Sequence, residues 1–264
     1  MGREDVQPQP ASWCSTVKVL EIDIETAPNV AYIWSLFDQN VPIDRLVSPG
    51  YTLCFAARWQ GEREIQFYSR WQHGHEKMIK TAWELMNEAD MLVHYNGKKF
   101  DVPTLNREFV LMGLTPPTSY HEVDLYQVVR KKFKFASNKL DFVAQQLGLG
   151  SKVKHKGMQL WHEVMNGVES SQRTMERYNK GDVRILGRLY DTLQPWIPSH
   201  PNRGLWVDNP TKPVCRNCGS THLKKNGSEK RFVLSYARFK CLDCGANLRS
   251  RLSIEGKRNA NILV

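Results

Sequence analysis

The chain has 264 residues, of which 41% are hydrophobic, and it carries a formal net charge of +10. This apolar content supports a packed core and excludes a predominantly disordered chain. No apolar run reaches the roughly 18 residues that a transmembrane helix needs, and residues 1–15 lack the apolar region of a secretory signal. Residues 201–264 hold a net charge of +9, which favours nucleic acid as a partner over an anionic membrane surface.

The first three quarters of the chain combine short strand-like runs with helical patterns. Runs rich in apolar and β-branched residues predict five strands: 17–24, 51–59, 64–68, 91–95 and 121–125. Tight connections among the first three strands predict antiparallel pairing there. Apolar residues at helical spacing predict six helices: roughly 75–88, 102–112, 124–132, 139–147, 157–167 and 171–193. This order predicts an α/β fold with a mixed five-stranded sheet flanked by helices.

The character of the sequence changes after the last predicted helix. Five of the 13 prolines fall within residues 195–213, which indicates a linker or an extended connecting arm. We therefore expect five segments in chain order: a disordered arm (1–15), a main domain (16–194), the proline-rich linker (195–213), a small module (214–250) and a basic tail (251–264).

Four acidic residues and one tyrosine form the candidate catalytic set. Asp23 and Glu25 alternate along the first strand and so share one face, while Asp101 follows a predicted strand and an Asn-Gly turn. Tyr178 and Asp182 lie one helical turn apart. Carboxylates near a core repel one another unless a cation compensates them, and divalent metal ions are suited to this. Taken singly, each acid also has a structural explanation, as a strand end, a helix cap or a solvated helix residue.

The order of three motifs resembles a known enzyme family. DIET (23–26), NGKKFD (96–101) and YNKGD (178–182) are similar to the motifs of DEDD superfamily 3′–5′ exonucleases. Arg177 stands where the histidine branch has its His, so the tyrosine branch fits better, and within it the proofreading exonuclease domain of family B DNA polymerases. The resemblance covers about residues 17–193 and implies an RNase H-like fold. It also implies two Mg²⁺ or Mn²⁺ ions that activate water and stabilise the leaving oxygen, held by Asp23, Glu25, Asp101 and Asp182, with Tyr178 orienting the water.

Several residues beside these motifs are candidates for contact with nucleic acid. They are basic, aromatic or amide side chains: Asn96, Lys98, Lys99, Phe100, Lys152 and Lys154. Four of these have a structural alternative. Asn96 suits a turn, Phe100 suits an apolar plug beside Asp101, and Lys152 and Lys154 suit a solvated loop.

The C-terminal module contains a metal-ligand pattern. Two CxxC pairs, separated by 22 residues, predict one structural Zn²⁺ bound by four thiolates: Cys215, Cys218, Cys241 and Cys244. Strand alternation over residues 230–241 predicts that the module is a zinc ribbon. The segment 214–250 resembles the zinc ribbons of transposases and phage replication proteins.

Basic and aromatic residues of the ribbon suit phosphate contact and base stacking. The basic set is Lys224, Lys225, Lys230, Arg231, Arg238, Lys240, Arg249 and Arg251, and the aromatic residues are Tyr236 and Phe239. We expect the ribbon to grip nucleic acid and feed the catalytic domain. A structural ribbon, or one that binds a protein partner, is the alternative.

These features predict a metal-dependent 3′–5′ exonuclease acting on single-stranded or frayed DNA ends. Nothing in the sequence reads a 2′-hydroxyl, so an exoribonuclease is an alternative, as are a structure-specific endonuclease and a non-catalytic nucleic-acid-binding protein. We expect DNA rather than RNA as the partner, no membrane association and a cytoplasmic location. The ribbon's resemblance is compatible with a phage-encoded protein acting in a bacterial host.

Overall fold

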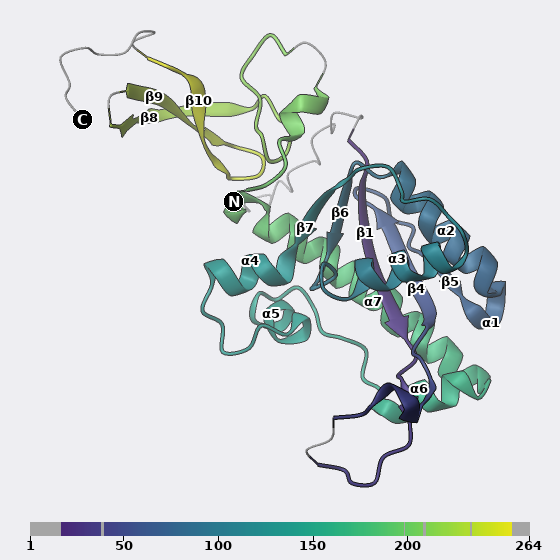
Figure 1. The fold of residues 1–264 in the computed structure, drawn as a ribbon. Helices are drawn as coiled ribbons and strands as arrows, with labels where there is room; N and C mark the ends of the chain where they lie inside the picture. Colours follow the sequence, from purple (N-terminus) through teal and green to yellow (C-terminus); the bar gives the residue numbers. More distant parts are fainter. Residues whose placement is uncertain (1–16, 38–39, 198, 208–209, 233, 255–264) are drawn as a thin grey trace, which may run out of the picture. The chain divides into compact units, whose positions relative to one another are not determined.

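The computed structural model describes residues 17–37, 40–197, 199–207, 210–232 and 234–254 (Figure 1). The predicted arm (1–15) lies outside the described residues, as does the tail beyond Ile254. The chain forms two compact units, of which one spans Lys18–Tyr190 and the other contains the chain from Asp191 onward. None of the helices among the described residues has the length and apolar character needed to cross a membrane.

The first unit is built on a mixed five-stranded sheet with strand order β5-β4-β1-β6-β7. β4 pairs antiparallel with both β1 and β5, whereas β6 lies parallel to β1 and β7. The predicted mixed sheet is therefore confirmed. The strands are β1 (Val19–Thr26), β4 (Thr52–Trp59), β5 (Gln66–Ser69), β6 (Met91–His94) and β7 (His121–Asp124).

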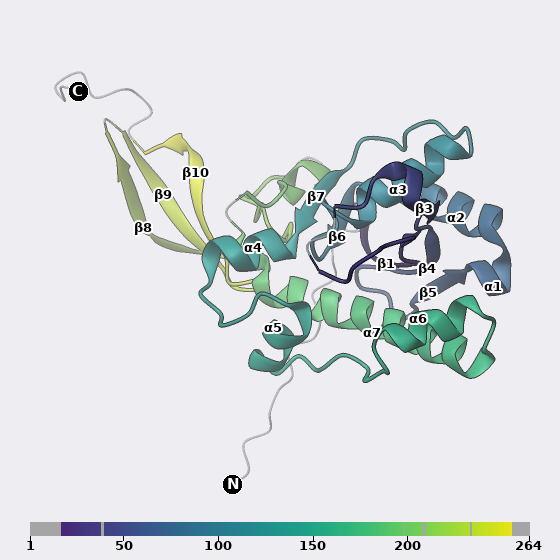
Figure 2. The same ribbon diagram turned by 60° about the horizontal axis from the view of Figure 1, so that its bottom comes forward.

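Helices cover both faces of this sheet. They are α1 (Arg70–His73), α2 (His75–Glu88), α3 (Asp101–Leu111), α4 (Leu125–Lys132), α5 (Leu140–Gln146), α6 (Met158–Met165) and α7 (Glu169–Leu193). Leu20, Ile22 and Ile24 of β1 pack with α2 and α3 in one apolar cluster. Residues of β4, α6 and α7 form another cluster on the other face, along which α7 runs (Figure 2). Because side chains alternate along a strand, the odd-numbered residues of β1 face α7.

The connection between β1 and β4 is long, so the predicted short connection is wrong there. Residues 27–51 contain β2 (Val30–Ala31), a 3₁₀ turn (Ile43–Arg45) and β3 (Leu46–Ser48), which pairs with β2. The segment extends from the end of the sheet at which β1 ends (Figure 1). Its strands are too short for a period-2 pattern to mark them in the sequence.

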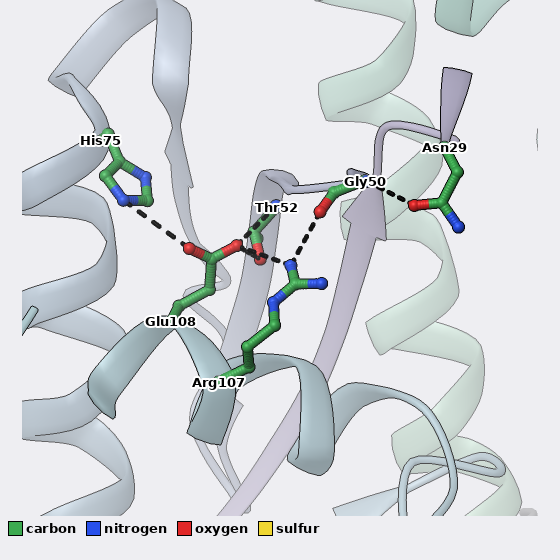
Figure 3. Close-up of polar contacts among 6 residues, drawn as sticks. All are labelled: Asn29, Gly50, Thr52, His75, Arg107 and Glu108. Atoms are coloured by element: carbon green, nitrogen blue, oxygen red, sulfur yellow. Dashed lines mark hydrogen bonds and ion pairs between the residues drawn. The ribbon is translucent and has the colours of Figure 1, made fainter. Parts of the chain in front are cut away.

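The buried carboxylate of Glu108 holds the C-terminal end of this connection (Figure 3). Glu108 of α3 accepts hydrogen bonds from the backbone N–H of Thr52 at 3.1 Å and from its hydroxyl at 3.3 Å. Arg107 donates to the carbonyl of Gly50 at 2.9 Å, and the Gly50 N–H donates to Asn29 at 2.6 Å. The C-terminal end of the connection is thus tied to α3, and Asn29 near its other end is tied to Gly50.

The second unit contains a three-stranded antiparallel sheet with strand order β10-β9-β8. Its strands are β8 (Leu223–Arg231), β9 (Leu234–Cys241) and β10 (Asn247–Ser253). The alternating segment 230–241 spans two strands, because β8 ends and β9 begins within it. Two 3₁₀ turns, Gln194–Trp196 and Arg203–Trp206, lie at the start of and within the segment predicted to be a linker.

Candidate active site

Acidic side chains from β1 and α7 meet at one place in the first unit. Oxygen atoms of Asp23, Glu25 and Asp182 all lie within 4.8 Å of one another. Asp23 and Glu25 project from β1 toward α7 because they occupy alternate strand positions. Asp182 lies on α7 and is almost fully buried, at 1% exposure. The structure thus brings together three of the four carboxylates that the sequence predicted.

Asp101 lies at the first turn of α3, beside the same strand. Its Oδ1 atom accepts a hydrogen bond from the backbone N–H of Ile24 at 3.0 Å, and the residue is buried. Ile24 lies between Asp23 and Glu25 in β1, so this bond holds Asp101 next to the pair. Asp101 is outside the group of three but close enough to influence the charge of Asp23.

A lysine reaches into the carboxylate group from the loop between α5 and α6. The Lys152 ammonium donates hydrogen bonds to Asp182 and, at 3.0 Å, to the hydroxyl of Tyr178. The backbone N–H of Lys152 donates to Asp141 at 2.7 Å, which fixes the loop. Sequence spacing placed Lys152 in a surface strip for phosphate contact, but the structure directs its side chain to the acidic residues.

Burial and mutual repulsion raise the pKa values of these acids. Burial, followed by repulsion from Asp182, raises the pKa of Asp23 well above its usual value and that of Glu25 to about 8. Burial also raises the pKa of Asp101 to about 6, against the opposing effect of the Ile24 hydrogen bond. The pKa of Asp182 is raised by burial although Lys152 acts against it. One ammonium group therefore compensates the carboxylates only in part.

The donor set fits hard divalent cations. All four acids offer oxygen ligands, which Mg²⁺ and Mn²⁺ prefer and which disfavour zinc. The Oδ1 atom of Asp182 is buried and has no hydrogen-bond partner among the described residues. Buried carboxylate oxygens of this kind need a cation or a donor to offset their lost hydration.

Asn179 contacts the candidate site but was not predicted from the sequence. It is fully buried, and its side-chain amide donates to Asp23 Oδ2 at 2.7 Å and to the Asp23 carbonyl at 3.2 Å. Asn179 precedes Asp182 by three positions, so both lie on the same helical face. The spacing between Asn179 and Asp182 was the available signal in the sequence, although it does not show which carboxylate the Asn179 amide contacts.

The turn before Asp101 has a conformation that favours asparagine. Asn96 has a φ of 66°, a backbone region that Asn adopts more readily than most residues. Its N–H donates to Asp124 at 2.9 Å, and Asp124 also caps α4. The turn-forming alternative for Asn96 is therefore supported. Four other candidates for nucleic-acid contact are exposed: Lys98, Lys99, Phe100 and Lys154.

The four C-terminal cysteines converge as predicted. The Sγ atoms of Cys215 and Cys244 are 3.7 Å apart, those of Cys218 and Cys241 are 3.6 Å apart, and all four lie within 4.8 Å. Tetrahedral zinc with Zn–S bonds of about 2.3 Å places its sulfur atoms about 3.8 Å apart. The cysteine cluster therefore has the dimensions of a structural zinc site.

Comparisons with known proteins agree with the fold. A model of the family RNase_H_2, described as RNase_H superfamily, matches residues 47–194. The structure of the family B DNA polymerase from the hyperthermophilic archaeon Pyrobaculum calidifontis is similar, with a TM-score of 0.51 and 20% sequence identity over 68% of this chain. This chain covers 25% of that polymerase chain, and the similarity is one of fold. Among curated proteins, none matches the sequence.

Proposed function

Because the chain belongs to the RNase H superfamily, we propose that it is a metal-dependent 3′–5′ exonuclease that hydrolyses phosphodiester bonds at single-stranded or frayed DNA ends. The observation that carries the proposal is the meeting of Asp23, Glu25 and Asp182, with Asp101 alongside and Tyr178 next to Asp182. The fold similarity to a family B DNA polymerase supports it.

The four carboxylates would hold two Mg²⁺ or Mn²⁺ ions. When bound, such ions supply charge neutralisation at the scissile phosphate and lower the pKa of an attacking water. Asn179 holds the Asp23 carboxylate by a direct hydrogen bond, and the Ile24 amide holds Asp101. Ligand oxygens fixed in this way need little rearrangement to accept cations.

Tyr178 is suited to orienting a water molecule and is a poor general base. Burial, followed by the Asp182 charge, raises the pKa of its phenol above its usual value. The phenol therefore keeps its proton at neutral pH and can form hydrogen bonds. Lys152 contacts the Tyr178 hydroxyl and Asp182, and Asp182 raises the pKa of Lys152 despite its burial. The Lys152 ammonium would supply a permanent positive charge beside the scissile phosphate.

Exposed residues next to the carboxylates would receive the substrate strand. Lys98 and Lys99 follow the Asn96 turn and are free to meet phosphates, while Phe100 is 46% exposed and could stack on a terminal base. A structural Zn²⁺ bound by the four cysteines would hold the ribbon together, and the ribbon would add affinity for nucleic acid.

The proposal is tested with single-stranded DNA and RNA oligonucleotides labelled at the 5′ end. We expect a ladder that shortens from the 3′ end when Mg²⁺ or Mn²⁺ is added, and no products without added metal. Asp23→Asn and Asp182→Asn should each abolish cleavage, whereas Asp44→Asn, at an exposed residue, should not. Tyr178→Phe should retain part of the rate.

The outcomes separate the alternatives. Cleavage by the Asp182→Asn protein at the rate of the unmodified chain would refute the assigned site. Internal cuts would indicate an endonuclease, and products from RNA alone would indicate an exoribonuclease. Intact oligonucleotides that nonetheless bind would indicate a nucleic-acid-binding protein without this activity.

A further inference from the structure

Basic side chains face one another across the ribbon sheet. In the strand register, Lys224 of β8 lies opposite Lys240 of β9, and Arg238 of β9 lies opposite Arg249 of β10. Opposite residues of an antiparallel pair project to the same face, as do residues two apart in a strand. These four residues therefore share one face of the sheet, which we call the basic face. All four are exposed.

Apolar side chains on the other face of the sheet lie against the cysteine cluster. Leu223 lies opposite Cys241, and Phe239 lies opposite Leu248. Leu223 and Leu248 pack on the buried cysteines, and Phe239 is less exposed than its neighbours Arg238 and Lys240. Base stacking on Phe239, expected from the sequence, is therefore not available from the basic face.

The basic face contains repulsion between like charges that no ion pair in the described part of the ribbon relieves. Like charges directly opposite one another destabilise a sheet. In the described part of the ribbon, carboxylates form ion pairs with other residues. Glu229, which lies opposite Tyr236 on the same side of the sheet, pairs with Arg231, and Asp243 pairs with His222. No ion pair joins a carboxylate to any residue of the basic face there. A surface of this kind is stabilised by an external polyanion.

Tyr236 has a role on the basic face that differs from base stacking. The Arg249 guanidinium lies 4.4 Å from the centre of the Tyr236 ring, which is cation–π geometry. The ring thereby restrains Arg249 and is covered by it on that side. Binding at this face would consequently depend on charge and not on base identity.

We infer that the basic face, formed by Lys224, Arg238, Lys240 and Arg249, binds the phosphate backbone of single-stranded nucleic acid through charge alone. The inference rests on the proposed function only for the choice of nucleic acid as the polyanion. Because its contacts are with phosphates, the face should not distinguish deoxyribose from ribose.

The test compares equal charge removal from the two faces of the same sheet. Arg238→Ala/Lys240→Ala changes the basic face. Lys225→Ala/Lys230→Ala is the matched control. The sequence grouped these two lysines with the phosphate contacts, but Lys225 lies opposite Phe239 and Lys230 opposite Ser235, on the other face. Binding of fluorescent dT20 and U20 would be followed by anisotropy at several salt concentrations, without added Mg²⁺ or Mn²⁺. Unchanged zinc content would show that each ribbon is folded.

We expect the basic-face variant to bind both oligonucleotides on the order of tenfold more weakly at low salt, with the salt slope reduced by about 1.4. The control should change much less. Equal losses in both variants, or none in either, would overturn the assignment of the face. Face-dependent binding to phosphatidylserine vesicles but not to oligonucleotides would overturn the choice of nucleic acid. Face-dependent binding by a chain that cleaves nothing would support this inference and refute the exonuclease proposal alone.

Discussion

At the scale of single residues, the candidate site depends on groups that orient the carboxylates. Asn179 donates to Asp23 from a fully buried position, and Ile24 donates its N–H to Asp101. Repelling acids would otherwise turn away from one another, which would leave a cation without a preformed set of ligands. Groups that hold ligands in this way commonly change metal affinity by about 10–100-fold when removed.

We expect Asn179→Ala to weaken Mn²⁺ binding by about tenfold, because the Asp23 carboxylate loses the donor that orients it. Isothermal titration calorimetry measures the affinity directly. Asn106→Ala is the control, since Asn106 is exposed on α3, and it should bind as the unmodified chain does. Equal Mn²⁺ affinity in the Asn179→Ala protein would remove Asn179 from the site.

At the scale of elements, the contact between β1 and α7 brings the motifs together. Glu21 lies on the same face of β1 as Asp23 and Glu25 and forms a part-buried ion pair with Arg58, with N–O distances of 2.7 and 2.6 Å. α7 passes this pair at Gly187. A Cβ atom there would lie 1.8 Å from Arg58 Nη2 and 2.5 Å from Glu21 Oε2.

Gly187→Ala should therefore lower the free energy of unfolding by about 1–3 kcal/mol. Alanine has the higher helix propensity by about 1 kcal/mol, but here the ion pair or α7 must move to admit the methyl group. Gly181→Ala is the matched control on the same helix. Its Cβ would meet Val153 at 3.5 Å, an ordinary contact, so it should be neutral or stabilising. Urea unfolding followed by tryptophan fluorescence compares the two, and an equal response to both changes would contradict this account.

At the scale of the whole molecule, two units carry two different kinds of metal-ligand set. The Lys18–Tyr190 unit gathers hard carboxylates, and the unit from Asp191 onward gathers four thiolates. The carboxylates repel one another without a cation, so metal and pH should act together on stability. The thiolates hold together a small sheet with little apolar core of its own.

Stability without divalent metal should fall as the pH rises from about 5 to about 8. Asp23, Glu25 and Asp101 have raised pKa values in the folded chain, about 8 for Glu25 and about 6 for Asp101. Between the unfolded values near about 4 and these folded values, the folded state holds more protons than the unfolded state. Its stability is therefore lost as the protons dissociate.

Thermal unfolding in chelating-resin-treated buffer measures this effect. Mn²⁺ should raise Tm more at pH 8 than at pH 5, because it replaces the lost protons as the source of compensation. The Asp23→Asn/Glu25→Gln double variant should show a smaller dependence on both pH and Mn²⁺. A metal effect that is equal at the two pH values would contradict the assigned cause.

The cysteine cluster should bind one zinc ion per chain. We expect its release only after the thiols are modified with a mercurial, as followed with a colorimetric zinc indicator. Cys218→Ser should reduce the zinc content and weaken oligonucleotide binding, because the sheet that carries the basic face loses its support. Full zinc content in the Cys218→Ser protein would exclude the four-thiolate site.

Much of the architecture could be predicted from local patterns. The helix at residues 75–88 has the bounds expected from its apolar spacing, because helical periodicity reports which side chains can share a buried face. The two CxxC pairs likewise predicted that the four cysteines lie together, since four thiolates at that spacing are typical of a structural zinc site. The three acidic motifs identified the candidate carboxylates, and these carboxylates lie close together in the structure.

Contacts between distant segments were decided only by the tertiary structure. The reach of Lys152 to Asp182 spans 30 positions and depends on where a loop crosses α7. The division of the ribbon's cations between two faces depends on a register shift after Lys225, which reverses the face of every later residue in β8. Sequence by itself determined the elements and the chemical groups, because these follow from local periodicity and residue type. The tertiary structure decided which groups meet, because partners and register are set by packing between elements that the spacing of one segment does not describe.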